Sequence, residues 1–336
     1  MRVESSMLSL SWIPSDSVSG WLRAGFDVGL AHYDNPPVDS LTTLEQVHRL
    51  RADDRFRFVN HLSAWAEFDE LGTPLEWGFA PESGIVMGST TVRVASVGAT
   101  FGGYALPVLQ QEPVVEDGSV HFTQTVGGRT GVPLPRPVPH APFVLWQAPI
   151  VWTTLALTLR ADGSTEIAMP GASVFPRHWV YGPDGTLSLK SGLTDLDGWM
   201  AHSFGPRTPW GEQDSEALVV EAETAVERQL SEGIMRGNGR PEIRRAPAGA
   251  TITTQGEPGE ELFLLLDGVL DVEVDGRQVA QVGPGAVLGE RAVLEGGART
   301  STLTAVTPVR IAVADAERLD VEKLRAVAEL HRREDG

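Results

Sequence analysis

The sequence predicts a mainly β protein with two domains. Its 336 residues exceed the length of one ordinary domain and are enough for two domains. Short segments of alternating polar and apolar residues recur between glycine-containing turns, a pattern typical of antiparallel strands. All nine Trp and all three Tyr lie in the first two thirds, which indicates a change of character along the chain. We expect an N-terminal β-rich sandwich or barrel that ends in a linker helix, followed by a C-terminal jelly-roll-like β-roll with a terminal helix.

Hairpin signals divide the N-terminal region into short strands. Residues 121–126 alternate between polar and apolar side chains. Three Asp-Gly dipeptides, at positions 117–118, 162–163 and 184–185, are typical of tight turns between antiparallel strands. Together these spacings predict an antiparallel meander.

One uncharged stretch, residues 141–159, approaches the length of a membrane-spanning helix. Pro142 and Pro149 interrupt it, and leucines then alternate with threonine or alanine up to Leu159. A period of two indicates a strand, so we expect a buried strand here and no association with a membrane.

Two helices are expected among these strands. The first covers residues 41–53 and begins after the cap-like Ser40. The second covers residues 215–235 and carries one apolar stripe, with Glu223 and Glu227 elsewhere on the helix. We expect this second helix to transmit a signal between the domains.

A cluster of helix-breaking residues at 237–241 marks the domain boundary. We therefore divide the chain into a β-rich effector domain of unknown function at 1–212, a linker helix and hinge at 213–241, and a second domain at 242–336.

The second domain also has the pattern of antiparallel strands. A continuous apolar run covers residues 262–266, and apolar and acidic residues alternate over 270–274 before a further Asp-Gly turn. Another alternating strand covers 309–313, and a closing helix follows Asp320. Eight or so short strands capped by a helix suggest a jelly-roll-like β-roll.

The residues that carry chemistry surround a short helical turn that starts at Glu290. Backbone N–H groups at such a start lack intrahelical partners and favour an anion. Nine residues later, Arg299 and Thr300 offer a guanidinium and a hydroxyl to the same phosphate. A carboxylate beside a phosphate needs a hydroxyl donor, and a ribose 2′-OH supplies one. A cyclic 3′,5′-phosphodiester provides both groups.

This segment resembles the cyclic nucleotide-binding family, which includes bacterial catabolite activators, protein kinase A regulatory subunits and nucleotide-gated channels. The similarity rests on Gly283-Pro284-Gly285, Gly289-Glu290 and Arg299-Thr300, because the family's phosphate-binding cassette reads roughly G-E-L-A-L-L and then R-x-A-[ST]. The resemblance covers residues 242–336 and implies a β-roll that binds a cyclic nucleotide.

The resemblance also implies the role of each site residue. Gly289 and Glu290 would hold the ribose 2′-OH. The backbone of Ala292 and the side chains of Arg299 and Thr300 would hold the phosphate. We expect cAMP as the ligand and keep cGMP as the alternative, because a threonine directly after the arginine is compatible with guanine in the syn form.

Three positions depart from the family pattern or leave it incomplete. Arg291 replaces the usual apolar residue, and it either adds positive charge near the phosphate or points to solvent. Ser301 replaces a small alanine. The closing helix has no aromatic residue to stack on the base, which leaves Leu330 or His331 as the lid.

Composition excludes several classes of site and partner. The formal net charge of −18 disfavours nucleic acid and anionic membranes. The absence of cysteine excludes disulfides and thiolate sites. Histidine spacing predicts no metal site, and His178 beside a tryptophan is expected to be structural. Without a secretory signal, a cytoplasmic location is expected.

These observations predict a cyclic-nucleotide sensor whose C-terminal domain regulates the N-terminal one. Three alternatives remain open: a transcription factor, which the lack of a C-terminal helix-turn-helix disfavours; an enzyme whose N-terminal domain is allosterically gated; and an assembly or scaffold protein with a vestigial nucleotide-binding domain. We expect no catalytic residue and no metal, do not assign an enzymatic activity, and leave a homo-oligomer open.

Overall fold

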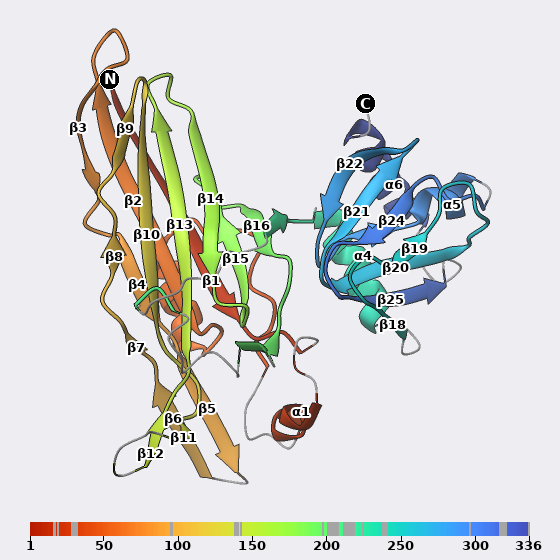
Figure 1. The fold of residues 1–336 in the computed structure, drawn as a ribbon, viewed down its shortest axis with the longest axis horizontal. Coiled ribbons are helices and arrows are strands. Elements are labelled where there is room, and N and C mark those ends of the chain that lie inside the picture. Colours follow the sequence, from red (N-terminus) through yellow and green to blue (C-terminus); the bar gives the residue numbers. More distant parts are fainter. Residues whose placement is uncertain are drawn as a thin grey trace. The chain divides into compact units, whose positions relative to one another are not determined.

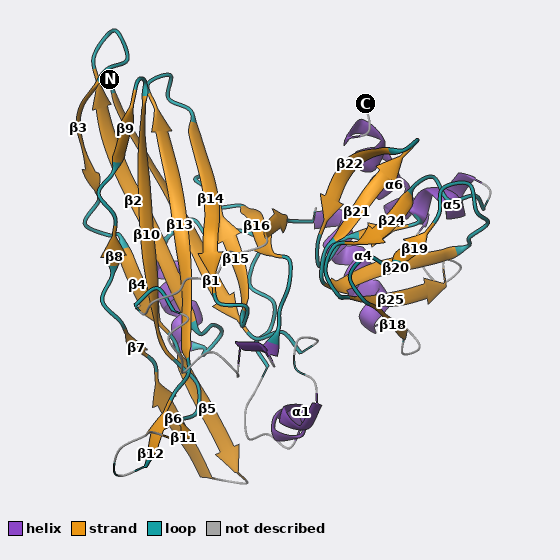
Figure 2. Ribbon diagram, in the orientation of Figure 1, coloured by secondary structure: helices purple, strands orange, loops and turns teal. Residues whose placement is uncertain are grey.

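The computed structural model describes residues 1–15, 18, 20–27, 33–94, 97–137, 141, 143–196, 198–199, 208–210, 219–223, 225–236, 241–295, 297–315 and 321–334. The chain forms two compact units. The first comprises Met1–Ser188 and Thr194–Leu218, and the second comprises Leu189–Leu193 and Val219–Gly336. Strands dominate both units, as the sequence predicts (Figure 1, Figure 2).

The first unit is built on a large antiparallel sheet with the strand order β15-β1-β2-β3. The central strand β1 (Arg2–Trp12) pairs with β15 (Arg177–Tyr181) on one side and β2 (Phe58–Phe68) on the other. β2 also pairs with β3 (Pro74–Phe79) and β4 (Gly84–Met87). The two long strands therefore form the middle of this sheet.

A second antiparallel sheet has β10 (Ser119–Arg129) and β13 (Ile150–Arg160) at its centre, with β14 (Thr165–Ala172) beside β13. Along its other edge, β10 pairs in turn with three short strands. These are β7 (Tyr104–Ala105), β8 (Leu109–Gln110) and β9 (Val114–Glu116).

The two sheets pack on each other as an open sandwich, and β1 and β2 contact β10 and β13 across the interface. The sequence predicted either a sandwich or a barrel. The strands do not close into a barrel. Phe122 and Leu155 are fully buried. Polar groups also bridge the sheets, since Asn60 donates to the carbonyl of Thr153 at 3.1 Å and accepts from Gln124 at 2.9 Å. Paired in this way, these buried amides avoid the cost of unsatisfied polar groups.

The uncharged stretch is only partly a buried strand. β13 is buried along nearly its whole length, whereas β12 (Val144–Gln147) is exposed and pairs with β11 (Leu134–Pro137) in a small hairpin. Pro149 lies between β12 and β13 and cannot donate to a ladder, which explains the break. A second hairpin joins β5 (Ser89–Val94) to β6 (Val97–Gly102). Pro142 lies outside the described residues.

The three Asp-Gly dipeptides form turns as predicted, and their glycines adopt φ values of +76°, +86° and +75°. They follow β9, β13 and β15 respectively. After the third turn comes β16 (Leu187–Ser191), whose last three residues belong to the second unit.

Two helices of the first unit are short. α1 spans Gly20–Asp27 and α2 spans Leu44–Ala52. α2 begins later than expected, because Thr43 and Gln46 form a reciprocal capping box. Ser40 instead forms an isolated bridge with Thr186.

The described part of the second unit contains two four-stranded antiparallel sheets together with the helices α4 (Ala225–Arg236), α5 (Glu290–Glu295) and α6 (Val321–Glu334), as expected for a β-roll. One sheet has the order β18-β25-β20-β23 and the other β19-β24-β21-β22. The strands of the first sheet are β18 (Glu242–Ala246), β25 (Val309–Asp315), β20 (Glu261–Asp267) and β23 (Val287–Leu288). Those of the second are β19 (Thr251–Thr253), β24 (Thr302–Ala305), β21 (Leu270–Val274) and β22 (Arg277–Val282).

The continuous apolar run in β20 has apolar neighbours on both faces. Leu262 and Leu264 pack with side chains of the helices α4 (Ala225–Arg236) and α6 (Val321–Glu334). Phe263 and Leu265 pack between the two sheets. A strand that is buried on both faces loses the polar alternation of a surface strand. The third helix, α5 (Glu290–Glu295), follows β23.

The expected helix over 215–235 is wrong in its first part. Val219–Glu221 form the strand β17, which pairs with the end of β16, and the helix α4 begins only at Ala225. Residues 215–218 lie outside the described residues. β-branched valines favour a strand once a pairing edge is available, and that edge comes from a segment distant in sequence.

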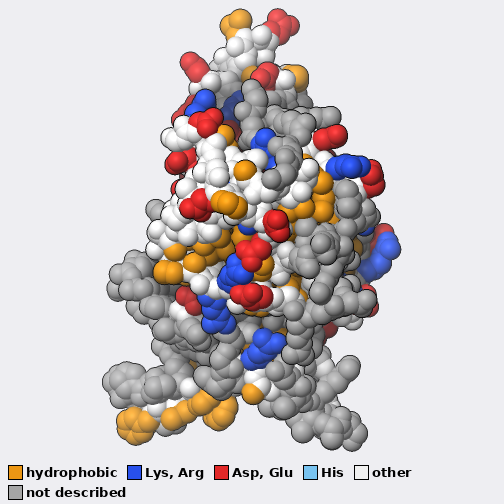
Figure 3. Space-filling model, turned by 90° about the vertical axis from the view of Figure 1, so that its right-hand side faces the viewer, with side chains coloured by type: hydrophobic (Ala, Val, Ile, Leu, Met, Phe, Trp, Pro, Cys, Tyr) orange, Lys and Arg blue, Asp and Glu red, His pale blue; other side chains and the backbone are white. Residues whose placement is uncertain are grey.

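On the face drawn in Figure 3, acidic and basic side chains are interspersed. No helix among the described residues is long and apolar enough to cross a membrane.

A substitution in the turn before β23 would test how tightly β17 packs on the β-roll. A Cβ at Gly283 would overlap a methyl group of the buried Val220. We expect Gly283→Ala to destabilise the second unit by about 1–3 kcal/mol through overpacking. Calorimetry of the full chain would measure this destabilisation. All nine Trp lie in the first unit, so tryptophan fluorescence identifies the unfolding transition of that unit, and the other transition belongs to the second unit.

The Val220→Ala exchange provides the control, since it removes the overlapping methyl. The double variant should be more stable than the sum of the two single effects implies. Strict additivity would contradict the proposed overlap.

Candidate functional site

A cavity of about 80 Å³ lies beside the turn between β23 and α5. Gly289 adopts a φ of +86° there, which favours glycine, and it delivers Glu290 to the first position of α5. Thr300 lines the same cavity. The structure thus brings three of the five expected site residues together. The remaining lining residues are Val272, Val274, Val279, Ala280, Val282, Leu288, Arg291, Ser301 and His331.

The carboxylate of Glu290 is held by a histidine from the terminal helix. Its side chain is 4% exposed, and its Oε1 lies 2.9 Å from Nδ1 of His331. The other ring nitrogen, Nε2, lies 3.4 Å from Oε1 of Glu227 on α4. Three helices therefore meet at one ionic cluster.

The cluster determines the charge of His331. Burial acts to lower its pKa, but hydrogen bonds and charge interactions with Glu227 and Glu290 outweigh burial and raise the pKa to about 10. The ring is therefore an imidazolium at neutral pH, and it can donate from both nitrogens to the two carboxylates.

Arg299 lies on the other side of Gly289. It is 7% exposed, its Nη1 donates to the backbone carbonyl of Glu261 at 2.8 Å, and its guanidinium lies 4.8 Å from the ring centre of Phe263. A Cβ at Gly289 would lie 2.6 Å from Nη1, and one at Gly259 would overlap the guanidinium. Only glycine therefore fits on either side of this side chain.

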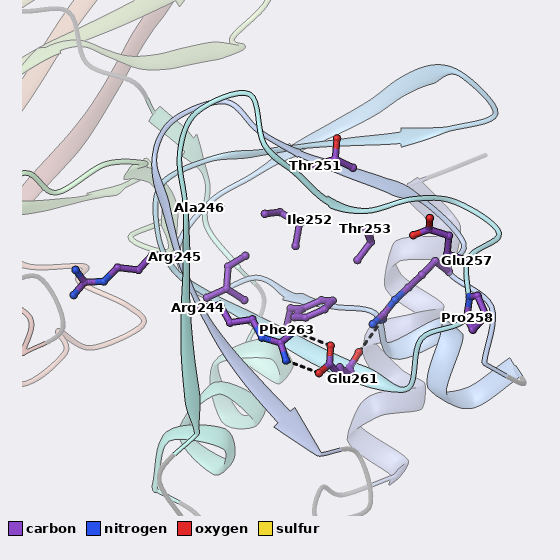
Figure 4. A pocket seen from close by; sticks show the side chains of 12 residues that line it. Arg244, Arg245, Ala246, Thr251, Ile252, Thr253, Glu257, Pro258, Glu261 and Phe263 are labelled. Atoms are coloured by element: carbon purple, nitrogen blue, oxygen red, sulfur yellow. Dashed lines mark hydrogen bonds and ion pairs between the residues drawn. The ribbon is translucent and has the colours of Figure 1, made fainter.

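Arg299 lines a second, larger cavity of about 320 Å³. Figure 4 shows this cavity, with Arg244 paired to Glu261 and Arg245 pointing away. Arg244 lies 2.6 Å from Glu261 and 2.8 Å from Glu242, so its charge is already compensated. The structure therefore places the expected phosphate ligand Arg299 and the expected ribose ligand Glu290 in different cavities, with Gly289 of the smaller cavity next to the guanidinium.

The remaining positions singled out from the sequence also have defined places. Ala292 is buried in α5, and its carbonyl accepts from the N–H of Gly297 at 2.6 Å. Arg291 and Ser301 both line the smaller cavity. The side chain of Leu330 lies outside the described residues.

One residue that pairs with the lining of the candidate site was not singled out from the sequence. Glu227 was assigned to the polar face of a helix, but its side chain is 7% exposed and pairs with His331. Glu223, assigned to the same face, is 5% exposed and forms an ion pair with Lys190. No local pattern distinguishes these glutamates from solvated ones, because their partners come from other elements.

His178 of the first unit is structural, as expected. It is fully buried, Nδ1 lies 2.7 Å from Oγ of Ser11, and Nε2 lies 2.7 Å from the carbonyl of Ser173. Burial lowers its pKa to about 4, so the ring is neutral and closed to solvent. Within the described ranges, no group of three or more His, Cys, Asp or Glu could hold a metal ion.

Comparison with known proteins assigns this unit. Residues 243–321 match the family model of the cyclic nucleotide-binding domain. The chain therefore carries a cyclic nucleotide-binding domain at its C-terminus, as the motif predicts.

Two curated relatives show the range of proteins with this similarity. The cGMP-dependent protein kinase egl-4 of Caenorhabditis elegans is 38% identical over 71 residues, which make up 21% of this chain and 9% of the kinase. The CRP-like cAMP-activated global transcriptional regulator of Mycobacterium tuberculosis is 33% identical over 78 residues, or 22% of this chain and 35% of the regulator. The similarity thus spans well under half of these relatives.

Among solved structures, a cyclic nucleotide-binding domain from Methylobacillus flagellatus is 26% identical, with a TM-score of 0.26. The match covers 28% of this chain and 62% of that one.

The ionic cluster predicts how stability depends on pH. A histidine whose folded pKa is near 10, against an ordinary value of 6.5, stabilises the folded state fully below about pH 6.5. That contribution is lost as the pH rises through 10. We expect the second unit to lose more stability between pH 6 and pH 10 in the wild type than in His331→Gln, as measured by denaturant unfolding. Parallel pH profiles for the two proteins would contradict the cluster.

Proposed function

We propose that the C-terminal domain binds cAMP in the smaller cavity. Glu290 would accept the ribose 2′-OH, and Gly289 would let the backbone approach the sugar. The phosphate would lie against the start of α5 at Ala292, with Arg299 and Thr300 contributing a guanidinium and a hydroxyl. The observation that carries the proposal is the convergence of Gly289, Glu290 and Thr300 on one cavity inside the matched domain.

The environment of Arg299 supports its role as the phosphate ligand. Burial lowers the pKa of the guanidinium, because desolvation disfavours the cation. Its direct contacts are a carbonyl and an aromatic ring, and the carboxylate of Glu261, which also acts on its charge, is already paired with Arg244. An anionic phosphodiester beside Gly289 would compensate this buried charge with charge-assisted hydrogen bonds.

The lining of the cavity favours adenine over guanine. Valines 272, 274, 279 and 282 present an aliphatic wall. Guanine carries an exocyclic carbonyl, an exocyclic amino group and a ring N1–H that need partners when buried, whereas the only exocyclic polar group of adenine is its amino group. The hydroxyls of Thr300 and Ser301 are the groups that would serve cGMP, which remains the alternative ligand.

We propose further that nucleotide binding regulates the first unit. Of the two segments that join the units, one packs on the turn before β23 and the other is paired with it. Val220 of β17 lies against Gly283, and Glu223 lies against Gly285 while pairing with Lys190 of β16. A shift of this turn on binding would therefore be transmitted to both segments. The coupling can be no larger than the ligand's differential affinity for the two arrangements.

The charge and composition of the chain bear on its partners and its location. The net charge of −18 disfavours nucleic acid and anionic membranes as partners. We place the protein in the cytoplasm, where its lack of cysteine fits a reducing environment.

Calorimetric titration of the intact protein tests the site. We expect cAMP to bind and to bind more tightly than cGMP. Arg299→Ala should weaken binding by roughly 1.5–3 kcal/mol, because a charge-assisted contact is lost.

Arg244→Ala is the matched control for that titration. Arg244 lines the larger cavity together with Arg299, but its guanidinium is already paired with Glu242 and Glu261, so its loss should leave cAMP affinity unchanged if the nucleotide occupies the smaller cavity. A protein that bound neither nucleotide would refute the assignment, and an equal loss in the two variants would move the ligand to the larger cavity.

Hydrogen exchange tests the regulatory part of the proposal. Saturation with cAMP should change the protection of backbone amides in Ala225–Arg236 and in Val219–Glu221, since the proposed shift of the turn before β23 would reach both segments. An unchanged exchange pattern there, with clear protection around α5, would leave binding intact but count against transmission.

A further inference from the structure

His331 joins the proposed ribose ligand to a helix outside the cavity. It lies on α6, contacts Glu290 at the start of α5 through Nδ1, and contacts Glu227 on α4 through Nε2. Both carboxylate side chains are less than a tenth exposed, so these contacts are shielded from solvent. Glu227 does not line the cavity, whereas the other two residues do.

The cavity in this arrangement is too small for the proposed ligand. Its volume of about 80 Å³ is several-fold below the roughly 300 Å³ of the smallest pockets that hold drug-sized ligands. Glu290 also already accepts a hydrogen bond from His331. A nucleotide that enters must therefore move His331 and take over at least part of the carboxylate.

We propose that His331 is a latch that the ribose hydroxyl displaces from Glu290, leaving the imidazolium paired with Glu227 alone. This inference rests on the proposed function of the cavity. The latch closes α6 over the unoccupied carboxylate. Its release converts a cluster of three helices into a pair formed by α4 and α6.

Glu227 makes the exchange feasible. A cation that left Glu290 without another partner would remain partly buried and unpaired, which is strongly unfavourable. With Glu227 in place, His331 keeps one carboxylate throughout. Glu227 therefore acts as a positioning residue. It does not touch the ligand, but it lowers the free energy of the state in which the ligand holds Glu290.

This arrangement predicts opposite effects for the two ends of the latch. His331→Ala removes the competitor for Glu290, so cAMP should bind at least threefold more tightly. Glu227→Gln leaves the displaced histidine without a counter-charge, so cAMP should bind at least threefold more weakly. The double variant should behave like His331→Ala, because Glu227 acts only through His331. Titration calorimetry on the full-length protein measures all three affinities.

Arg325→Ala is the control for the loss of a basic side chain from α6. Arg325 is exposed and pairs with Glu322 of the same helix at 2.8 Å, so its removal should not change affinity. If wild type and variants all fail to bind cAMP or cGMP, the proposed function and the latch fall together. If the wild type binds but the two latch variants shift affinity in the same direction, or not at all, only the latch is overturned.

Discussion

Burial of one guanidinium organises the C-terminal β-roll. A cation removed from water is costly unless its surroundings compensate it. Arg299 is compensated by the carbonyl of Glu261 and the face of Phe263. Its bulk leaves no space for a side chain at Gly259 or Gly289. A side chain at either of these two glycines would therefore require the guanidinium to shift.

The helices of the same unit are held by a second arrangement of buried charge. α4 and α6 share an apolar core with β20, which includes Leu230, Leu264 and Leu324. Within this apolar packing lies the ionic cluster of His331 with its two glutamates. Because His331 and Glu290 line the smaller cavity while Glu227 lies outside it, the cluster joins that cavity to α4.

Paired polar groups as well as apolar packing hold the interior of the first unit. Buried polar groups such as Asn60 and Gln124 pair across the sandwich, and Arg57 forms a buried ion pair with Asp34 at 2.7 Å. Its exposed apolar side chains include the run Phe143–Trp146 at the β11–β12 hairpin, where Trp146 is 67% exposed.

The sequence alone determined the features that depend on local pattern. Alternation predicted β21 and β25, Asp-Gly dipeptides predicted the turns, and the spacing of Glu290 and Arg299 predicted the binding domain. Only the tertiary structure decided that Val219–Glu221 form a strand, that Arg299 opens on a second cavity, and that Glu227 is buried against His331. Each of these depends on a partner far along the chain, and local periodicity carries no information about which distant segments meet.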